Sequence, residues 1–127
     1  MLRLIRPLIP LAVAAGLLAS AVPTLAKGGN DDRVQKSGDC SGAANWKLKA
    51  KPDDGRLEVE FEVDQNRNGV KWNVVIKRNG TTAVRTTATT KAPSGSFSVE
   101  RRIAGTSGKI TATATRSGES CKGSVSV

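Results

Sequence analysis

The stretch WKLKAKPDDGRLEVEFEVD, residues 46–64, decides the fold. Apolar and charged side chains alternate on both sides of its central PDDG segment, residues 52–55. A period of two is typical of β-strands that bury one face, and Pro, Asp and Gly together favour a turn. The stretch therefore predicts an antiparallel hairpin with one apolar face and one charged face.

A four-residue PDDG connection gives this hairpin a definite register. Ala50 would face Leu57, and Lys49 would face Glu58. Lysine then lies opposite glutamate along the outward face, and each such pair contributes roughly a few tenths of a kcal/mol. Because these charges neutralise one another, we interpret the Lys and Glu rows as structural.

The same alternation recurs in the rest of the chain. The other apolar stretches are Val70–Ile76, the region around Val84, Phe97–Val99, Ile110–Ala114 and Cys121–Val127. Turn-forming segments separate them, and seven short strands of this kind predict an all-β, immunoglobulin-like antiparallel β-sandwich over residues 40–127.

Two places in this pattern need a decision on register. At Asn79-Gly80 a plain two-residue turn would pair Ile76 with Ala83, whereas a bulge would pair it with Val84. We expect the bulge, since it keeps Val84 on the apolar face. Arg101-Arg102 interrupts the alternation and indicates a bulge or the end of a strand.

Residues 1–26 read as a signal peptide, with a short basic region, an apolar run from Leu8 to Val22 and a cleavage site after Ala26. The alternative is an uncleaved anchor, but the run is shorter than the roughly 20 residues that span a bilayer. Secretion to the extracellular space is therefore expected. The polar residues 27–39 are expected to form a flexible tail.

The chain contains two cysteines, Cys40 and Cys121. Export to an oxidising compartment predicts that they form a disulfide. The bond would close a loop of about 80 residues, for which the chain-entropy model gives roughly 4.5 kcal/mol. The chain has no histidine and no CxxC spacing, so a metal-binding thiol pair is not expected.

The segment DQNRNG, residues 64–69, resembles the first half of a calcium loop. Its candidate ligands are Asp64, Asn66 and Asn68. The closing glutamate is missing, because Val75 stands at the twelfth position, and Arg67 adds a positive charge inside the loop. We interpret the segment as a turn and expect no metal.

The sequence offers little for catalysis. It has no histidine, no tyrosine and no GxSxG segment, so the common ways of activating a nucleophile are absent. We expect no enzyme activity, no catalytic residue and no cofactor. Asn79-Gly80-Thr81 is a glycosylation sequon whose use depends on the host.

Charge is distributed unevenly along the chain. Residues 27–64 hold 7 basic and 9 acidic side chains, whereas residues 65–127 hold 11 basic and 2 acidic ones. Such a field attracts polyanions, and the alternative is a basic surface without a dedicated partner. The candidate polyanion-binding residues are Lys71, Lys77, Arg78, Arg85, Arg101, Arg102, Lys109 and Arg116.

The partner that this charge predicts is an anionic polymer of the cell surface or another protein. All four aromatic residues, Trp46, Phe61, Trp72 and Phe97, fall at inward-facing positions. Specific nucleic-acid binding is therefore not expected, because single-strand recognition uses exposed aromatic rings. The domain is expected to be a monomer.

The segments WKLKAKPDDGRLEVEFEVDQNRNGVKWNVVIKRNG (46–80) and APSGSFSVERRI (92–103) resemble small exported actinobacterial proteins of unknown function. The resemblance implies a secreted β-sandwich and no site residues. More distantly, a bridge between the chain ends is similar to some cellulose- and chitin-binding modules. A carbohydrate-binding module is thus the alternative function, and it would require an exposed Trp46 or Trp72.

Overall fold

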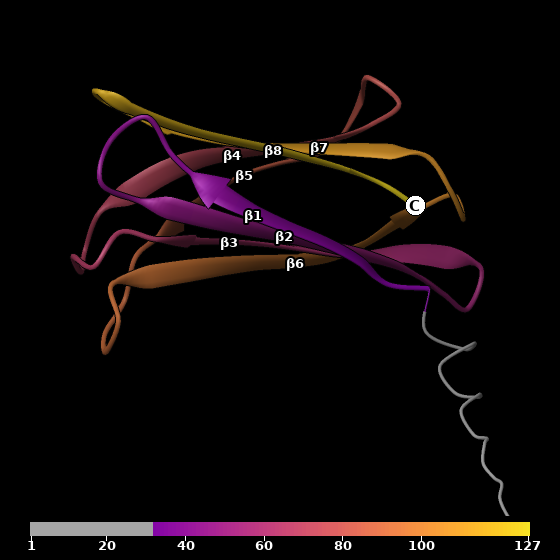
Figure 1. Cartoon of the computed structure of the whole chain (residues 1–127), viewed down its shortest axis with the longest axis horizontal. Coiled ribbons are helices and arrows are strands. Elements are labelled where there is room, and N and C mark those ends of the chain that lie inside the picture. Colours follow the sequence, from indigo (N-terminus) through magenta and orange to yellow (C-terminus); the bar gives the residue numbers. More distant parts are fainter. Residues whose placement is uncertain (1–31) are drawn as a thin grey trace, which may run out of the picture. The chain divides into compact units, whose positions relative to one another are not determined.

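The computed structural model describes residues 32–127, which form two four-stranded antiparallel sheets packed face to face (Figure 1). Sheet A has the order β1-β2-β3-β6, and sheet B has the order β5-β4-β7-β8. The strands of sheet A are β1 (Val34–Asp39), β2 (Asn45–Asp53), β3 (Arg56–Asp64) and β6 (Ser96–Ala104). Those of sheet B are β4 (Lys71–Arg78), β5 (Thr81–Thr89), β7 (Lys109–Arg116) and β8 (Glu119–Ser126).

This arrangement confirms the predicted all-β sandwich. The predicted signal peptide and residues 27–31 of the predicted tail lie outside the described residues. No helix in residues 32–127 is long and apolar enough to cross a membrane.

The seven predicted strands correspond to β2 through β8, and β1 is an additional strand. The prediction of a flexible tail is wrong for residues 34–39, which pair with β2 along their whole length, from Val34 opposite Ala50 to Asp39 opposite Asn45. An edge strand needs only one neighbour, and β1 is held by its backbone ladder and by Val34, which packs against the core.

The first hairpin has a tighter turn than predicted. Asp53 pairs with Arg56, so only Asp54 and Gly55 form the turn, with φ of 56° and 80°. Positive φ at both residues suits the two-residue turn that matches strand twist. The predicted register is therefore wrong by two residues: Lys49 faces Glu60. Because side chains alternate with a period of two, a shift of two keeps every side chain on its predicted face.

The second hairpin contains the expected bulge. Ile76 faces Val84 as predicted, while Lys77 pairs with Thr82, so the extra residue is Ala83. The prediction of a bulge or strand end at Arg101-Arg102 is wrong, because β6 continues to Ala104 in an unbroken register with β3. The backbone ladder carries the strand through both arginines.

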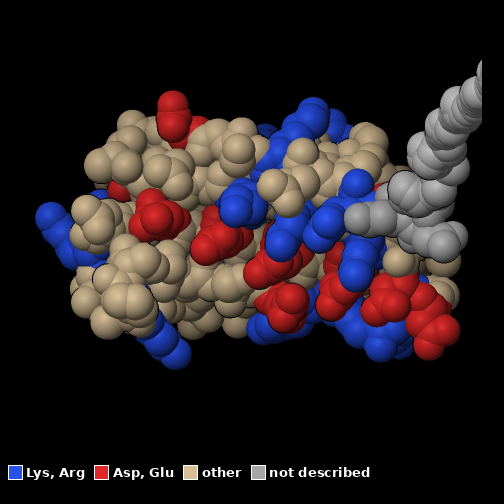
Figure 2. All heavy atoms as spheres, turned by 60° about the horizontal axis from the view of Figure 1, so that its bottom comes forward, with Lys and Arg blue, Asp and Glu red and all other residues tan. Residues whose placement is uncertain are grey.

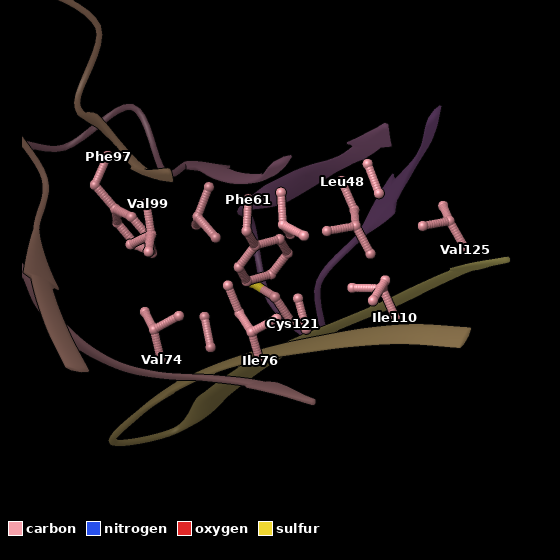
Figure 3. Packing of buried hydrophobic residues seen from close by; sticks show 14 of the residues in the cluster. Leu48, Phe61, Val74, Ile76, Phe97, Val99, Ile110, Cys121 and Val125 are labelled. Carbon is pink, nitrogen blue, oxygen red and sulfur yellow. The ribbon is translucent and has the colours of Figure 1, made fainter. Parts of the chain in front are cut away.

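The core lies between the two sheets (Figure 3). In Figure 3, Val99 and Phe61 of sheet A lie across from Val74 and Ile76 of sheet B, and Leu48 lies across from Ile110. Burial of such side chains contributes about 1.5–3 kcal/mol each, so this layer is the main source of stability.

The Cys40–Cys121 disulfide is present as predicted, with a Cα–Cα distance of 4.3 Å. Cys40 directly follows β1, and Cys121 lies in β8. The bond therefore joins the β1–β2 loop of sheet A to an edge strand of sheet B. The opposite side of the sandwich, where β5 and β6 are the end strands, has no disulfide within residues 32–127.

Candidate functional site

The outer face of sheet A carries alternating lysine and glutamate side chains from β2 and β3. The ion pairs are Lys47–Glu62 at 4.0 Å, Lys49–Glu60 at 2.9 Å and Lys51–Glu58 at 3.6 Å. Figure 2 shows basic and acidic side chains interleaved over the side of the molecule that lies at the bottom of Figure 1. The predicted neutralisation is confirmed, with partners shifted by the tighter turn.

Glu60 is the most strongly held carboxylate of this row. The hydrogen bond from Lys49 lowers its pKa below the ordinary value of 4.5, burial opposes this shift, and a hydrogen bond from Ser98 adds to it. The Ser98 hydroxyl donates to Glu60 Oε2 at 2.9 Å. These interactions occupy the carboxylate, which leaves sheet A without a free charged row.

The outer face of sheet B differs in having cations without carboxylates. Because Trp72, Val74 and Ile76 point into the core, their neighbours in β4 point outward. The only acidic residue in the four strands is Glu119, which is buried. We define the basic face as the five exposed cations of this surface: Lys71, Lys77, Arg85, Lys109 and Lys122.

Hydroxyl side chains lie between these cations. Thr113 of β7 stands between Val75 of β4 and Lys122 of β8, and Arg85 of β5 lies on the far side of Val75. With strands about 4.8 Å apart, Arg85 and Lys122 project from positions about 14 Å apart. None of the five cations makes an ion pair with any residue from 32 to 127. The basic face is thus a flat array of spaced positive charges and hydroxyl groups.

Four of the eight predicted polyanion-binding residues lie on the basic face, namely Lys71, Lys77, Arg85 and Lys109. Lys122 belongs to the same face but was not among the candidates. Its alternation with Cys121 and Gly123 could have placed it there, because both neighbours are buried.

Arg78 lies away from the basic face, at the end of β4. Its Nε donates a hydrogen bond to the carbonyl oxygen of Ser107 at 2.7 Å, and its guanidinium group packs closely against Gly105. The neighbouring Asn79 Oδ1 accepts a hydrogen bond from Lys109 N at 2.9 Å. Arg78 therefore fastens the β4–β5 turn to the loop between β6 and β7, and the sequon asparagine takes part in the same contact.

Arg116 also has a structural position. Its guanidinium carbon lies 5.4 Å from the centre of the Trp72 ring, and its Nη2 is 3.0 Å from Glu119 Oε1. The other carboxylate oxygen of Glu119 accepts a hydrogen bond from Ala44 N at 2.9 Å. These contacts hold Arg116 in a partly buried network, so it is less available to a ligand than the exposed lysines are.

Arg101 and Arg102 lie near each other in β6 but have different surroundings. Arg102 is held at the first hairpin: its Nη2 donates to the carbonyl oxygen of Asp53 at 3.0 Å and lies 3.8 Å from the Asp53 carboxylate. Arg101 makes no ion pair with any residue from 32 to 127 and donates only to the carbonyl oxygen of Glu100, at 2.9 Å.

The DQNRNG segment forms a turn that is fastened to Thr90. Asp64 Oδ1 accepts a hydrogen bond from Asn66 N at 3.1 Å. Thr90 Oγ1 donates to the carbonyl oxygen of Arg67 at 2.6 Å and accepts from Val70 N at 2.9 Å. No group of three His, Cys, Asp or Glu side chains within residues 32–127 is placed to hold a metal ion. The local hydrogen bonds account for the arrangement of this segment.

The two tryptophans, which the carbohydrate-binding alternative needs to be exposed, differ in burial. Trp72 is fully buried, and its Nε1 donates to Gln65 Oε1 at 3.1 Å. Trp46 is half-buried, and its indole packs closely against Gly38 of β1 and Gly123 of β8. Trp46 lines an open hollow together with Asp39 and Glu62, and no second aromatic residue within residues 32–127 lines that hollow.

The two outer faces are therefore chemically different: sheet A is neutralised by ion pairs and sheet B is not. Both faces are rich in lysine, so the difference arises from the acidic residues, which lie opposite the lysines of β2 in sheet A but, within residues 32–127, are absent from the outer face of sheet B. Comparisons of the chain with protein-family models, with curated proteins and with solved structures found no match.

Proposed function

We propose that the chain is a secreted, non-enzymatic β-sandwich that binds an anionic polymer of the cell envelope on its basic face. The observation that carries the proposal is the difference between the two sheets. The three lysines of β2 have glutamate partners within 4.0 Å, whereas the five cations of the basic face have none among residues 32–127.

A flexible polyanion fits this surface better than a compact ligand. Spaced point charges on a flat sheet attract a polymer through many weak contacts, and the hydroxyl groups between them can donate hydrogen bonds to its phosphate, sulfate or carboxylate oxygens. Exposed charges of this kind are screened by salt, so the binding should weaken steeply as ionic strength rises.

We assign the sandwich to the immunoglobulin-like kind. The chain crosses between the sheets from β3 to β4, from β5 to β6 and from β6 to β7, and its other connections are hairpins within a sheet or, for β1–β2, a short loop. Crossings of this sort are typical of Greek-key sandwiches. On this assignment β1 is an extra edge strand before the common set.

Secretion is supported by the leader-like residues 1–26 and by the Cys40–Cys121 disulfide, which is typical of oxidising compartments. Mass spectrometry of the protein recovered from culture medium should show a chain that begins at Lys27. Recovery of the intact leader on cell-associated protein would indicate the anchor alternative instead.

The binding proposal is tested with two triple variants that remove the same charge. Lys77→Gln/Lys109→Gln/Lys122→Gln changes the basic face, and Lys47→Gln/Lys49→Gln/Lys51→Gln changes the neutralised face. Retention on immobilised polyphosphate and on immobilised polyglutamate is measured across a salt gradient. The first variant should elute at much lower salt than the native protein, and the second should elute close to it.

Equal elution of the two variants would show that net charge alone governs retention, and would contradict a binding role for the basic face. The proposal also fails if the native protein is retained at low salt no better than an uncharged control protein. Circular dichroism of each variant establishes beforehand that it is folded.

A further inference from the structure

A groove runs along the side of the sandwich where the two sheets end in β5 and β6. Each of these strands pairs with only one neighbour. Two hollows lie between them, with volumes of about 650 Å³ and 460 Å³. Arg101 lines both hollows, which makes them adjoining parts of one open groove.

Arg101 occupies an unusual position for a charged residue. It lies between Val99 and Ile103 on the core-facing side of β6, opposite Val59 of β3. Its side chain is exposed and has no acidic partner within residues 32–127. Because the side chain reaches water, it tolerates this inward-facing position without a partner, and its guanidinium group can pair with a carboxylate from outside.

The remaining lining of the groove consists of apolar, hydroxyl-bearing and basic side chains. Val84 and Ala88 of β5 are half-buried there, and Phe97, Val99 and Ile103 of β6 lie below them. No acidic side chain lines either hollow. The groove thus combines apolar and hydroxyl-bearing side chains around a positive centre.

The two edge strands differ in how readily they accept a further strand. β5 has a bulge at Ala83, which disturbs the hydrogen-bond ladder and protects an edge from pairing. β6 is regular over its nine residues and pairs with β3 without a register shift. Ser96 at the start of β6 is bridged to Lys91, and beyond it the free edge presents an ordered row of backbone donors and acceptors, which recognise a peptide backbone in particular.

We propose that the groove binds an extended acidic segment of a partner protein, which adds to β6 as a fifth strand of sheet A. A carboxylate of the segment pairs with Arg101. Apolar residues two positions before and after it lie against Val99 and Ile103, because alternate residues of a strand share one face. The site centres on Arg101, whereas the basic face lies on the outside of sheet B; Arg85 of the basic face also lines the larger hollow, so the two surfaces meet at β5.

The probe is a fluorescein-labelled, blocked heptapeptide of the order Thr-Val-Thr-Glu-Thr-Val-Thr, whose binding to the native protein is followed by fluorescence anisotropy. A second peptide has lysine in place of the central glutamate, and a third has alternate backbone amides methylated. The first peptide should bind at least about tenfold more tightly than either of the others, because they lack the charge pair or the ladder.

Variants of the protein locate the contact. Arg101→Ala should weaken binding of the glutamate peptide about tenfold or more, and Arg101→Glu should prefer the lysine peptide. The matched control is Lys36→Ala, which removes a cation from β1, the opposite edge strand of sheet A. This control should bind the glutamate peptide like the native protein. On adding that peptide, backbone amides of β6 should gain protection from hydrogen exchange while those of β1 should not.

Three outcomes would overturn the proposal. The first is equal weakening by Arg101→Ala and Lys36→Ala, which would indicate general electrostatic attraction. The second is binding that backbone methylation leaves unchanged. The third is absence of peptide binding together with self-association of Arg101→Ala, which would show that Arg101 instead protects the β6 edge from a second copy of the chain. The comparison with the methylated peptide uses only the native protein, so it tests strand addition even if a variant does not fold.

Discussion

Glu119 shows how a buried charge organises its surroundings. Its side chain is only 3% exposed, and its carboxylate joins three parts of the chain: β8, the β1–β2 loop through Ala44 N, and β7 through Arg116. Gly42 packs closely against this carboxylate, so a side chain at that position would displace it. The network therefore fixes the loop that carries Cys40.

Glu119→Gln keeps the shape of this side chain but removes its charge. We expect a loss of about 2 kcal/mol in the free energy of unfolding, because Arg116 would keep a partly buried charge without its counter-charge. Urea unfolding measures the change. Glu100→Gln, at an exposed position of β6, is the control and should stay within about 0.5 kcal/mol of the native protein. Equal values for the two variants would contradict a structural role for Glu119.

Glu60 provides a pH-dependent contribution to stability. Its pKa in the folded chain is lowered, and the largest cause is the hydrogen bond from Lys49. Glu100 of β6 is the residue opposite Glu60 in the strand register. A lowered folded pKa contributes stability that is present above the unfolded value of 4.5 and is lost as pH falls through the folded value. The native protein should therefore lose more stability than Glu60→Gln as pH is lowered from about 5 to 3.

Urea midpoints measured at a series of pH values for both proteins check this expectation. Lys49→Gln should also lessen the loss, because it removes the main cause of the lowered pKa. If the urea midpoints of all three proteins fall in parallel as pH is lowered, other carboxylates govern the loss of stability at low pH.

The strands themselves illustrate what a sequence can predict. Alternation in β2 and β3 identified both strands and their buried faces, because period two leaves little choice about which residues are apolar. The register was wrong by two because PDDG can form either a four-residue or a two-residue connection, and both keep Lys opposite Glu. The positive φ of Asp54 and Gly55 decides between them, and the Asp-Gly dipeptide, which is typical of two-residue hairpin turns, was the signal that favoured the tighter connection.

The strand β1 was missed for a different reason. Its residues VQKSGD include one apolar side chain large enough to pack, Val34, so it lacks the alternation that marks a strand. It forms because β2 offers a free edge and because Gly38 leaves room for the Trp46 indole beside it. Such a strand depends on its neighbours, which a local pattern does not contain.

Packing of β8 against β2 depends on a small residue under the Trp46 ring. A Cβ at Gly123 would overlap the indole. Gly123→Ala should therefore lower the free energy of unfolding by about 1–3 kcal/mol through overpacking. It should also displace the indole and make Trp46 more accessible to acrylamide quenching. The change can be assigned to Trp46, because the second tryptophan, Trp72, is fully buried.

The control is Ser124→Ala, the next position of β8, whose side chain lies on the outer face of sheet B. It should change neither stability nor quenching noticeably. If Gly123→Ala is as stable as the native protein, the indole must have a second position that the structure does not contain.

At the scale of the molecule, the uneven charge of the sequence becomes a difference between faces. Residues 27–64 contain all the acidic residues except Glu100 and Glu119, and the strands of that segment lie in sheet A. The sequence therefore predicted a basic half, but not which cations lie together. Arg78 and Arg116 are held by Ser107 and Glu119 respectively, contacts between strands that only the folded chain brings close.

The two sides of the sandwich also differ, because one is closed by a disulfide and the other holds the groove. The closed loop spans 81 residues, so most of the chain is constrained when unfolded. The chain-entropy model gives about 4.5 kcal/mol for such a loop as an upper-end figure. This is a large part of the roughly 5–15 kcal/mol that stabilises a typical domain.

Cys40→Ala/Cys121→Ala should therefore lower the free energy of unfolding by about 3–4.5 kcal/mol, measured by urea unfolding. The folded structure should persist, because Ser41 N donates to the carbonyl oxygen of Ser120 at 2.8 Å and Ser41 Oγ accepts from Ser120 N at 2.9 Å, which holds the loop in place without the bond. Binding of the glutamate peptide should then match that of the native protein at temperatures where the variant is folded. A loss of peptide binding in a folded variant would mean that the disulfide controls the spacing of the sheets across the whole sandwich, and that the open side depends on the closed one.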